Sequence, residues 1–246
     1  MTATVTHIWR HPIKGIGCEA LDSAEVSPEG AVHGDRAWAL LHQDAPDTDE
    51  WQKRRNFLVV ANGPDLARIH AETNGADITL THPTRPTLSF DPATDPTALA
   101  DWVTPLWPAT SPAPGRLVRA PGHGMTDMPE PFISVGNLAS LRALSAATGV
   151  EMDARRFRIN VWVDGLSPWE ETSWDIGTML TIGEVPCTLA LPIDRCAATE
   201  ANPETGERDV DTLRHLWKLD QGKAFGLYLN VDAPGTIRLG DGVALA

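Results

Sequence analysis

The stretch LPIDRCAATEANPETGERD, residues Leu191–Asp209, joins a buried strand to a polar loop. Met179–Ile193, most of which precedes it, is rich in β-branched and apolar residues, which predicts two short strands. Within the stretch, Asn202–Gly206 (NPETG) has Pro and Gly at positions favoured in turns. Cys196 therefore lies where a strand gives way to a loop, a position that can fix a side chain and leave it accessible.

Arg195 directly precedes Cys196. A neighbouring guanidinium favours the thiolate over the thiol, and the thiolate is both the nucleophile and the metal ligand. The alternative is that Cys196 is a small buried apolar residue, as many free cysteines are. Both interpretations remain open on this stretch alone, and its local sequence favours the structural one.

The chain is acidic, with 20 Lys and Arg against 33 Asp and Glu in 246 residues and a net charge of −13. Such a chain repels nucleic-acid phosphates and anionic membrane surfaces, so we expect no nucleic-acid and no membrane partner. The N-terminus lacks the basic start and apolar run of a signal peptide. The three widely spaced cysteines (Cys18, Cys187 and Cys196) suit a reducing compartment, which predicts a cytoplasmic location.

Twenty prolines and twenty glycines indicate many short strands joined by turns, so the predicted fold is mainly β with a few helices. One clear helical pattern lies within Pro131–Val150, where Gly149 is placed as a C-cap and Ser134 or Asn137 could cap the start. Phe157–Val163 is predicted as a strand, and Thr110–Gly115 (TSPAPG) as the core of a linker between two domains.

Basic side chains lie at predicted strand ends or beside turns throughout the chain: Lys14, Arg36, Arg156, Arg158 and Arg195. They could converge on one anionic ligand, because guanidinium groups match phosphate oxygens. They could equally be five unrelated surface ion pairs, and spacing alone favours that second interpretation.

Several motifs in a fixed order resemble the MOSC family, named after the C-terminal domain of molybdenum cofactor sulfurase. They are HPIKG near the N-terminus, GDRAW at Gly34–Trp38, RFRIN at Arg156–Asn160, the Arg195–Cys196 pair and the NPETG turn. The resemblance implies two packed β-barrel-like domains: a MOSC N-terminal barrel at residues 1–108 and a MOSC domain at 115–246. A cofactor would lie in the cleft between them.

The resemblance to amidoxime-reducing members also implies a molybdenum–pterin cofactor with Cys196 as catalytic metal ligand, which suits a soft thiolate. Lys14, Arg36 and Arg158 would hold the pterin phosphate, with Asn160 on the same strand as Arg158. The resemblance further implies a cofactor-binding role for Arg195, which is next to the metal ligand. It implies the same role for Ser134 and Asn137 at the predicted helix start, where free N–H groups can bind an anion. The five basic residues are then expected to converge, with Arg156 the one that could be structural.

The function implied is reduction of small N-hydroxylated compounds, with electrons from a separate protein. The alternative is a sulfur-carrier or cofactor-handling module that uses a Cys196 persulfide, and simple storage of the cofactor needs no other residues. One departure from the family pattern is Lys14–Gly15 where Lys–Ser is frequent, which removes one hydroxyl contact.

Overall fold

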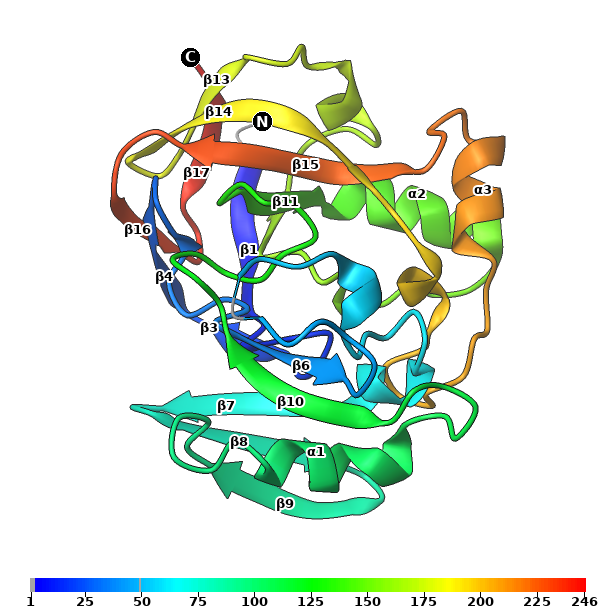
Figure 1. Cartoon of the computed structure of the whole chain (residues 1–246). Helices are drawn as coiled ribbons and strands as arrows, with labels where there is room; N and C mark the ends of the chain where they lie inside the picture. Colours follow the sequence, from blue (N-terminus) through cyan, green and yellow to red (C-terminus); the bar gives the residue numbers. More distant parts are fainter. Residues whose placement is uncertain (1–2, 49) are drawn as a thin grey trace.

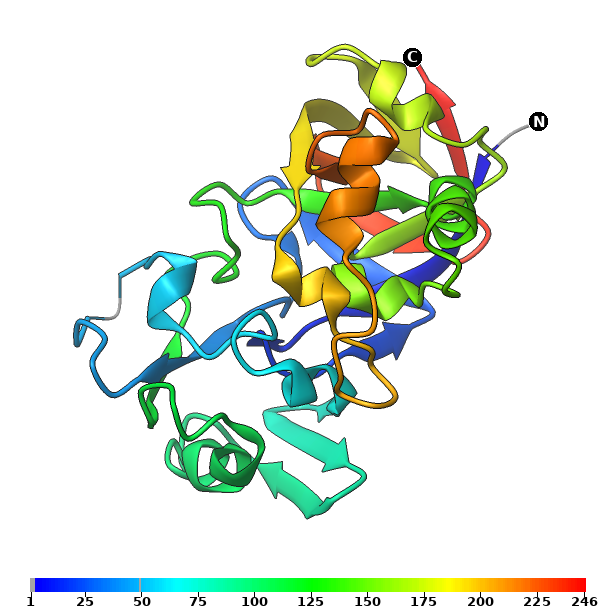
Figure 2. The same cartoon turned by 90° about the vertical axis from the view of Figure 1, so that its right-hand side faces the viewer.

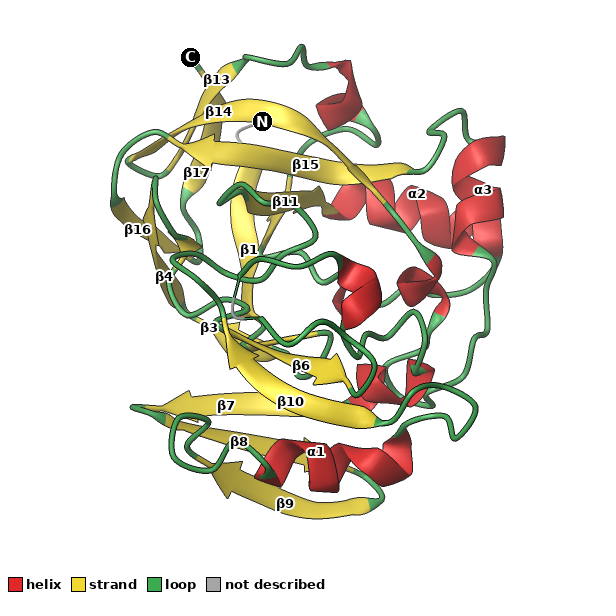
Figure 3. Ribbon diagram, in the orientation of Figure 1, coloured by secondary structure: helices red, strands yellow, loops and turns green. Residues whose placement is uncertain are grey.

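A closed barrel dominates the computed structural model, which describes residues 3–48 and 50–246 (Figures 1 and 3). Within these residues seven strands pair in a ring, and the last strand of the ring bonds to the first. In ring order they are β12 (Val161–Asp164), β11 (Ile133–Asn137), β15 (Ala224–Val231), β14 (Val185–Asp194), β13 (Met179–Ile182), β17 (Gly242–Leu245) and β1 (Ala3–Arg10). The short strand β3 (Glu19–Leu21) pairs with the C-terminal part of β1, at Ile8–Arg10.

Apolar side chains fill the interior of this barrel. Alternate residues of β1 and β15 are buried, as expected for strands with one face on a core. The interior cluster includes Val5, Leu180, Leu189 and Leu229. The barrel is therefore a packed scaffold, and a ligand site has to lie at its edge.

The rest of the chain forms smaller antiparallel and mixed sheets. Strands β7 (His70–Asn74), β8 (Asp77–His82) and β9 (Arg85–Phe90) form a sheet that packs with α1 (Ala98–Val103) at the end of the molecule opposite the C-terminus (Figure 2). The other two sheets comprise β2 (Ile13–Lys14), β6 (Trp38–His42) and β10 (Pro114–Arg119), and β4 (Ser23–Ser27), β5 (Ala31–Val32) and β16 (Gly235–Arg238). The predicted mainly β fold with two packed barrel-like units is confirmed.

The two units share strands. β1 and β4 come from the first part of the chain, yet β1 pairs with β12 and β17, and β4 pairs with β16. Within the predicted linker, residues 110–113 belong to no helix or strand, whereas Pro114 begins β10, which bonds to β6. The units are thus held together by main-chain pairing as well as by packing.

Helix α2 (Leu138–Thr148) follows its predicted pattern. The side chain of Asn137 accepts a hydrogen bond from the amide of Ala139, and Gly149 ends the helix with a φ of 73°. The remaining helix, α3 (Thr212–Lys218), contacts α2, and 3₁₀ helices occupy Arg54–Asn56, Pro64–Arg68, Thr104–Leu106, Ala154–Phe157, Glu170–Ser173 and Ala197–Glu200. Among the described residues no helix is long and apolar enough to cross a membrane.

The strand predicted over Phe157–Val163 is wrong in its first half. Asp153 caps the 3₁₀ helix Ala154–Phe157, and Arg158 then adopts a left-handed φ of 51°. Only from Val161 does the chain run as strand β12. The apolar alternation of this segment suits a strand, but the local cap and the left-handed residue end the helix in a turn. Arg158 and Asn160 therefore lie on that turn.

Candidate functional site

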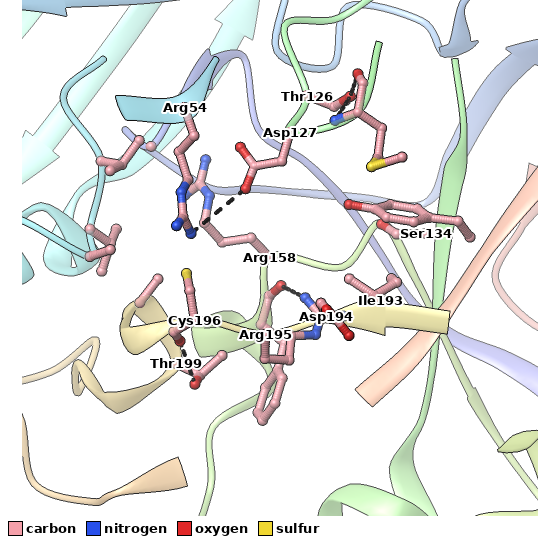
Figure 4. A pocket seen from close by; sticks show the side chains of 18 of the residues that line it. Arg54, Thr126, Asp127, Ser134, Arg158, Ile193, Asp194, Arg195, Cys196 and Thr199 are labelled. Atoms are coloured by element: carbon pink, nitrogen blue, oxygen red, sulfur yellow. Dashed lines mark hydrogen bonds and ion pairs between the residues drawn. The ribbon is translucent and has the colours of Figure 1, made fainter. Parts of the chain in front are cut away.

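A cavity of about 500 Å³ lies where loops of the barrel meet loops of the smaller sheets (Figure 4). Six of the sequence-predicted site residues line it: Lys14, Arg36, Ser134, Arg158, Asn160 and Arg195. Cys196 lines it as well, beside the 3₁₀ helix Ala197–Glu200. The structure thus gathers residues from positions 14 to 196 around one space.

Cys196 is held by the end of β14 and the turn that follows. The strand ends at Asp194, and the carbonyl of Cys196 accepts hydrogen bonds from the amide and the hydroxyl of Thr199, at 3.1 and 3.0 Å. The side chain is half-buried and directs its sulfur into the cavity (Figure 4). A thiol in this position is fixed by its backbone and open to a ligand.

Arg195 anchors the backbone beside Cys196. Its guanidinium donates to the carbonyl of Phe225 from Nε and Nη2, at 2.8 and 2.6 Å, and to the carbonyl of Phe157 from Nη1, at 2.8 Å. It also lies 5.6 Å from the centre of the Phe157 ring. Burial lowers the pKa of Arg195 to about 10. These donors are committed to main-chain carbonyls, so Arg195 fixes the strand end.

Arg36 and Arg158 bring two half-buried guanidinium groups to the cavity. The Asp35 carboxylate accepts from the amide of His11 at 2.8 Å and forms an ion pair with Arg36, which places Arg36 in a left-handed turn with a φ of 49°. Arg36 Nη2 donates to the carbonyl of Arg158 at 2.7 Å. Although burial opposes it, Asp35 raises the pKa of Arg36.

Arg158 has no such carboxylate among its hydrogen-bond partners in the described residues. It donates to the carbonyls of Gly17 and Ile13 at 3.1 and 3.3 Å. Burial, and then the charge of Arg36, lower the pKa of Arg158 to about 10. A bound anion would relieve both effects, because it supplies the missing negative charge.

Lys14 brings a third cation from β2. Its side chain is buried, and Nζ lies 2.5 Å from Oδ1 of Asp127 and 5.6 Å from the centre of the Phe57 ring. Burial lowers the pKa of Lys14, and Asp127 offsets part of that effect. Lys14, Arg36 and Arg158 therefore converge, as the resemblance implied.

Ser134 and Asn160 form a buried reciprocal pair on the cavity wall. The Ser134 hydroxyl donates to the side-chain Oδ1 of Asn160 at 2.7 Å and accepts from the main-chain N–H of Asn160 at 2.9 Å. Asn160 Nδ2 donates to the carbonyl of Trp9 at 3.1 Å. These bonds join β11, the turn before β12 and β1, so Ser134 reaches the cavity from a strand.

Asn137 does not reach the cavity. It caps α2, and its Nδ2 donates to Glu171 Oε2 at 2.7 Å and to the carbonyl of Ser167 at 2.8 Å. The start of α2 therefore faces a buried carboxylate at the far end of β11. The implied use of this helix start for an anion does not fit the structure.

Arg156 has the structural role that the sequence analysis gave as its alternative to binding a ligand. Its side chain is 1% exposed and forms a two-pronged pair with the Asp209 carboxylate at 2.7 and 2.8 Å. It also donates to the carbonyl of Glu200 at 3.1 Å, at the end of the 3₁₀ helix that Cys196 precedes. Arg156 thus holds the segment that carries the thiol.

The sequence analysis missed Arg54, Asp127 and Tyr228, which also line the cavity. Arg54 begins the short 3₁₀ helix Arg54–Asn56 and Asp127 lies in a loop, and neither segment has a recognisable sequence pattern. Tyr228 lies on β15, and its ring stacks on Phe132 at 5.5 Å between centres. Among the described lining residues six side chains are cationic and two anionic, in a chain of net charge −13. The cavity is thus a basic site in an acidic protein.

The backbone conformation and surroundings of Gly15 explain why this chain has Lys14–Gly15 where Lys–Ser is frequent in the family. Its φ is 73°, and a Cβ there would meet the carbonyl oxygen of Leu58 at 2.4 Å and Cα of Val59 at 2.8 Å. We expect Gly15→Ser to destabilise the fold by about 3 kcal/mol, because it adds a main-chain clash to a strained φ. Urea denaturation measures this change.

The matched control is Gly75→Ser, at a φ of 63° with open space around the added Cβ. We expect it to cost about 1 kcal/mol, the strain alone. Equal denaturation midpoints for the two variants would contradict the clash.

Family comparisons match both parts of the chain. The MOSC N-terminal beta barrel domain matches residues 2–110, and the MOSC domain matches residues 122–244. The chain belongs to the MOSC family. Human mitochondrial amidoxime-reducing component 1 is 26% identical to this MOSC protein over 285 aligned residues, which cover 98% of this chain and 82% of that protein.

Two further proteins are similar to this chain. Molybdenum cofactor sulfurase of Drosophila pseudoobscura pseudoobscura is 36% identical over 95 residues, which cover 38% of this chain and 12% of that protein. The solved structure of the YUAD protein from Bacillus subtilis is 14% identical with a TM-score of 0.49, and the match covers 99% of this chain and 94% of that one.

Proposed function

We propose that this MOSC protein binds a molybdenum–pterin cofactor in the cavity and reduces N-hydroxylated compounds with electrons from a separate protein. One observation carries the proposal: the thiol of Cys196 shares a cavity of about 500 Å³ with the buried Lys14 and the half-buried Arg36 and Arg158. The name of the amidoxime-reducing relative supports the substrate class.

The cationic end of the cavity fits a phosphate group. Burial lowers the pKa values of Lys14 and Arg158, which means that the isolated cavity destabilises their charges. A phosphate favours those charged forms and matches the planar donors of a guanidinium. Lys14, Arg36 and Arg158 would hold this phosphate, and the Ser134–Asn160 pair would keep the wall behind it fixed.

The thiol end fits a soft metal ion. Cys196 would be the protein ligand, and a thiolate suits a metal that its cofactor already coordinates through sulfur. When bound, the cofactor supplies the removal of an oxygen atom from nitrogen. The net reaction takes two electrons and two protons and releases water. Arg195 and Arg156 fix the backbone on either side of the thiol.

A second candidate is a sulfur carrier that holds a persulfide on Cys196. The similarity to molybdenum cofactor sulfurase favours it, since that match covers 38% of this chain. The same half-buried thiol would serve both functions. For either function we propose a reducing compartment such as the cytoplasm, because the three cysteines are free in the structure.

An assay of amidoxime reduction with an artificial electron donor tests the proposal. The protein is purified from a host that makes molybdenum cofactor, and we expect formation of the amidine. Bound molybdenum without any amidine would contradict the reductase function and indicate storage. A labile sulfur atom on Cys196 without molybdenum would support the sulfur carrier.

A further inference from the structure

The loop between β10 and β11 places a carboxylate at the mouth of the basic cavity. Thr126, Asp127 and Met128 from this loop line the cavity. The Asp127 side chain is 48% exposed, and its two oxygens lie 2.5 Å from Lys14 Nζ and 4.0 Å from Arg54 Nη1. One carboxylate thus links the loop to β2 through Lys14 and to the 3₁₀ helix Arg54–Asn56 through Arg54, which lies beside Asp127 in Figure 4.

The cations around Asp127 are those that the cavity offers to an anion. Burial raises the pKa of Asp127, but Lys14, and then Arg54 and Arg36, outweigh burial and lower it below the usual value. Arg158 interacts with the same carboxylate. Asp127 therefore remains ionised and supplies part of the negative charge that the site lacks.

A phosphate bound by Lys14 cannot share that position with the carboxylate. The Lys14 side chain is only 4% exposed, so the remaining donors of its Nζ face few alternative partners. Two anions at one ammonium group repel each other at short range. Asp127, by contrast, belongs to an exposed loop and can turn to solvent without breaking a strand.

We propose that Asp127 acts as an internal ligand that occupies the anion position of the cavity, and that a phosphate-bearing ligand binds by displacing it. The inference rests on the proposed function for the identity of that ligand, the pterin phosphate. The displacement itself concerns any phosphate. The ion pair at the mouth would keep the basic cavity neutralised until such a ligand arrives.

Titration calorimetry with inorganic phosphate tests the displacement on the full chain, produced in a host that makes no molybdenum cofactor. We expect Asp127→Asn to bind phosphate about tenfold more tightly than wild type, because no ion pair has to break. Glu130→Gln removes the same charge from the same loop at an exposed residue outside the cavity lining. We expect it to change affinity by less than about twofold.

Phosphate affinity that is unchanged or weaker in Asp127→Asn would overturn the proposal. An unchanged affinity would mean that Asp127 does not compete with phosphate, and a weaker one that Asp127 helps to bind it. Hydrogen exchange gives an independent readout. Saturating phosphate is expected to speed amide exchange at Thr126–Met128 in wild type, since the loop is released. Slower exchange there would show the loop closing over the ligand and would also overturn the proposal.

Molybdenum uptake separates the two claims. A chain that shows phosphate-driven release of Asp127 but takes up no molybdenum or pterin would refute the proposed function and leave the displacement standing. Normal molybdenum uptake combined with unchanged phosphate affinity in Asp127→Asn would refute the displacement alone.

Discussion

Replacing Cys196 by serine is expected to abolish amidoxime reduction while the protein stays folded. The hydroxyl is nearly the same size as the thiol but lacks the soft sulfur donor that suits a metal already coordinated through sulfur. Cys196 is half-buried and its backbone bonds to Thr199 do not involve the sulfur. We therefore expect the free energy of unfolding to change by less than about 1 kcal/mol. Steady-state turnover and thermal denaturation measure the two effects.

Cys187→Ala is the matched control for loss of a thiol. Cys187 is 1% exposed inside the barrel, where burial raises its pKa to about 12, so it remains a protonated core residue. We expect this variant to lose some stability and to keep its turnover per bound molybdenum. Turnover that persists in Cys196→Ser with bound molybdenum would disprove the role assigned to Cys196.

Replacing Asp209 by alanine is expected to cause a large loss of stability. It leaves the Arg156 guanidinium buried, with a side chain 1% exposed, and without its carboxylate. Breaking such a pair costs about 3 kcal/mol, which corresponds to a fall in melting temperature of about 6 to 12 °C. Glu207→Ala, on the same exposed loop, is the control and should change the melting temperature by less than about 2 °C. Similar losses in both variants would contradict this account.

The same pair predicts how stability depends on acid. The hydrogen bonds from Arg156 lower the pKa of Asp209 below its ordinary value of 3.8. A carboxyl with a depressed folded pKa contributes stability above its unfolded pKa and loses that contribution as pH falls toward the folded value. Wild type is therefore expected to lose its advantage over Asp209→Asn below about pH 4. Parallel curves of melting temperature against pH, from pH 7 to 2, would contradict the prediction.

The sequence was sufficient to assign a residue to the site where its chemistry and a family motif indicated the same role. Arg36 lies at a turn that its own neighbour stabilises, because the Asp35 carboxylate accepts from the amide of His11 and pairs with Arg36. Cys196 follows the buried strand β14 as predicted. In each case short-range sequence dictates the turn, and the fold then brings the turns together.

Other features depend on contacts that the sequence does not reveal. Arg54 and Asp127 meet across the cavity mouth, although they are far apart in the sequence. Arg158 occupies a turn where alternation predicted a strand, because the Asp153 cap and a left-handed φ override the pattern. The side chain of Asn137 accepts from the amide of Ala139 at the start of α2 and donates to the Glu171 carboxylate. This capping role keeps it out of the cavity.

The central claim is that the basic cavity and its thiol hold a molybdenum–pterin cofactor. The most direct test is the molybdenum and pterin content of the wild-type protein purified from a host that makes this cofactor. We predict near-stoichiometric amounts of both, and loss of the pterin when Lys14 and Arg158 are both replaced by glutamine. Wild-type protein that contains neither molybdenum nor pterin would contradict the account.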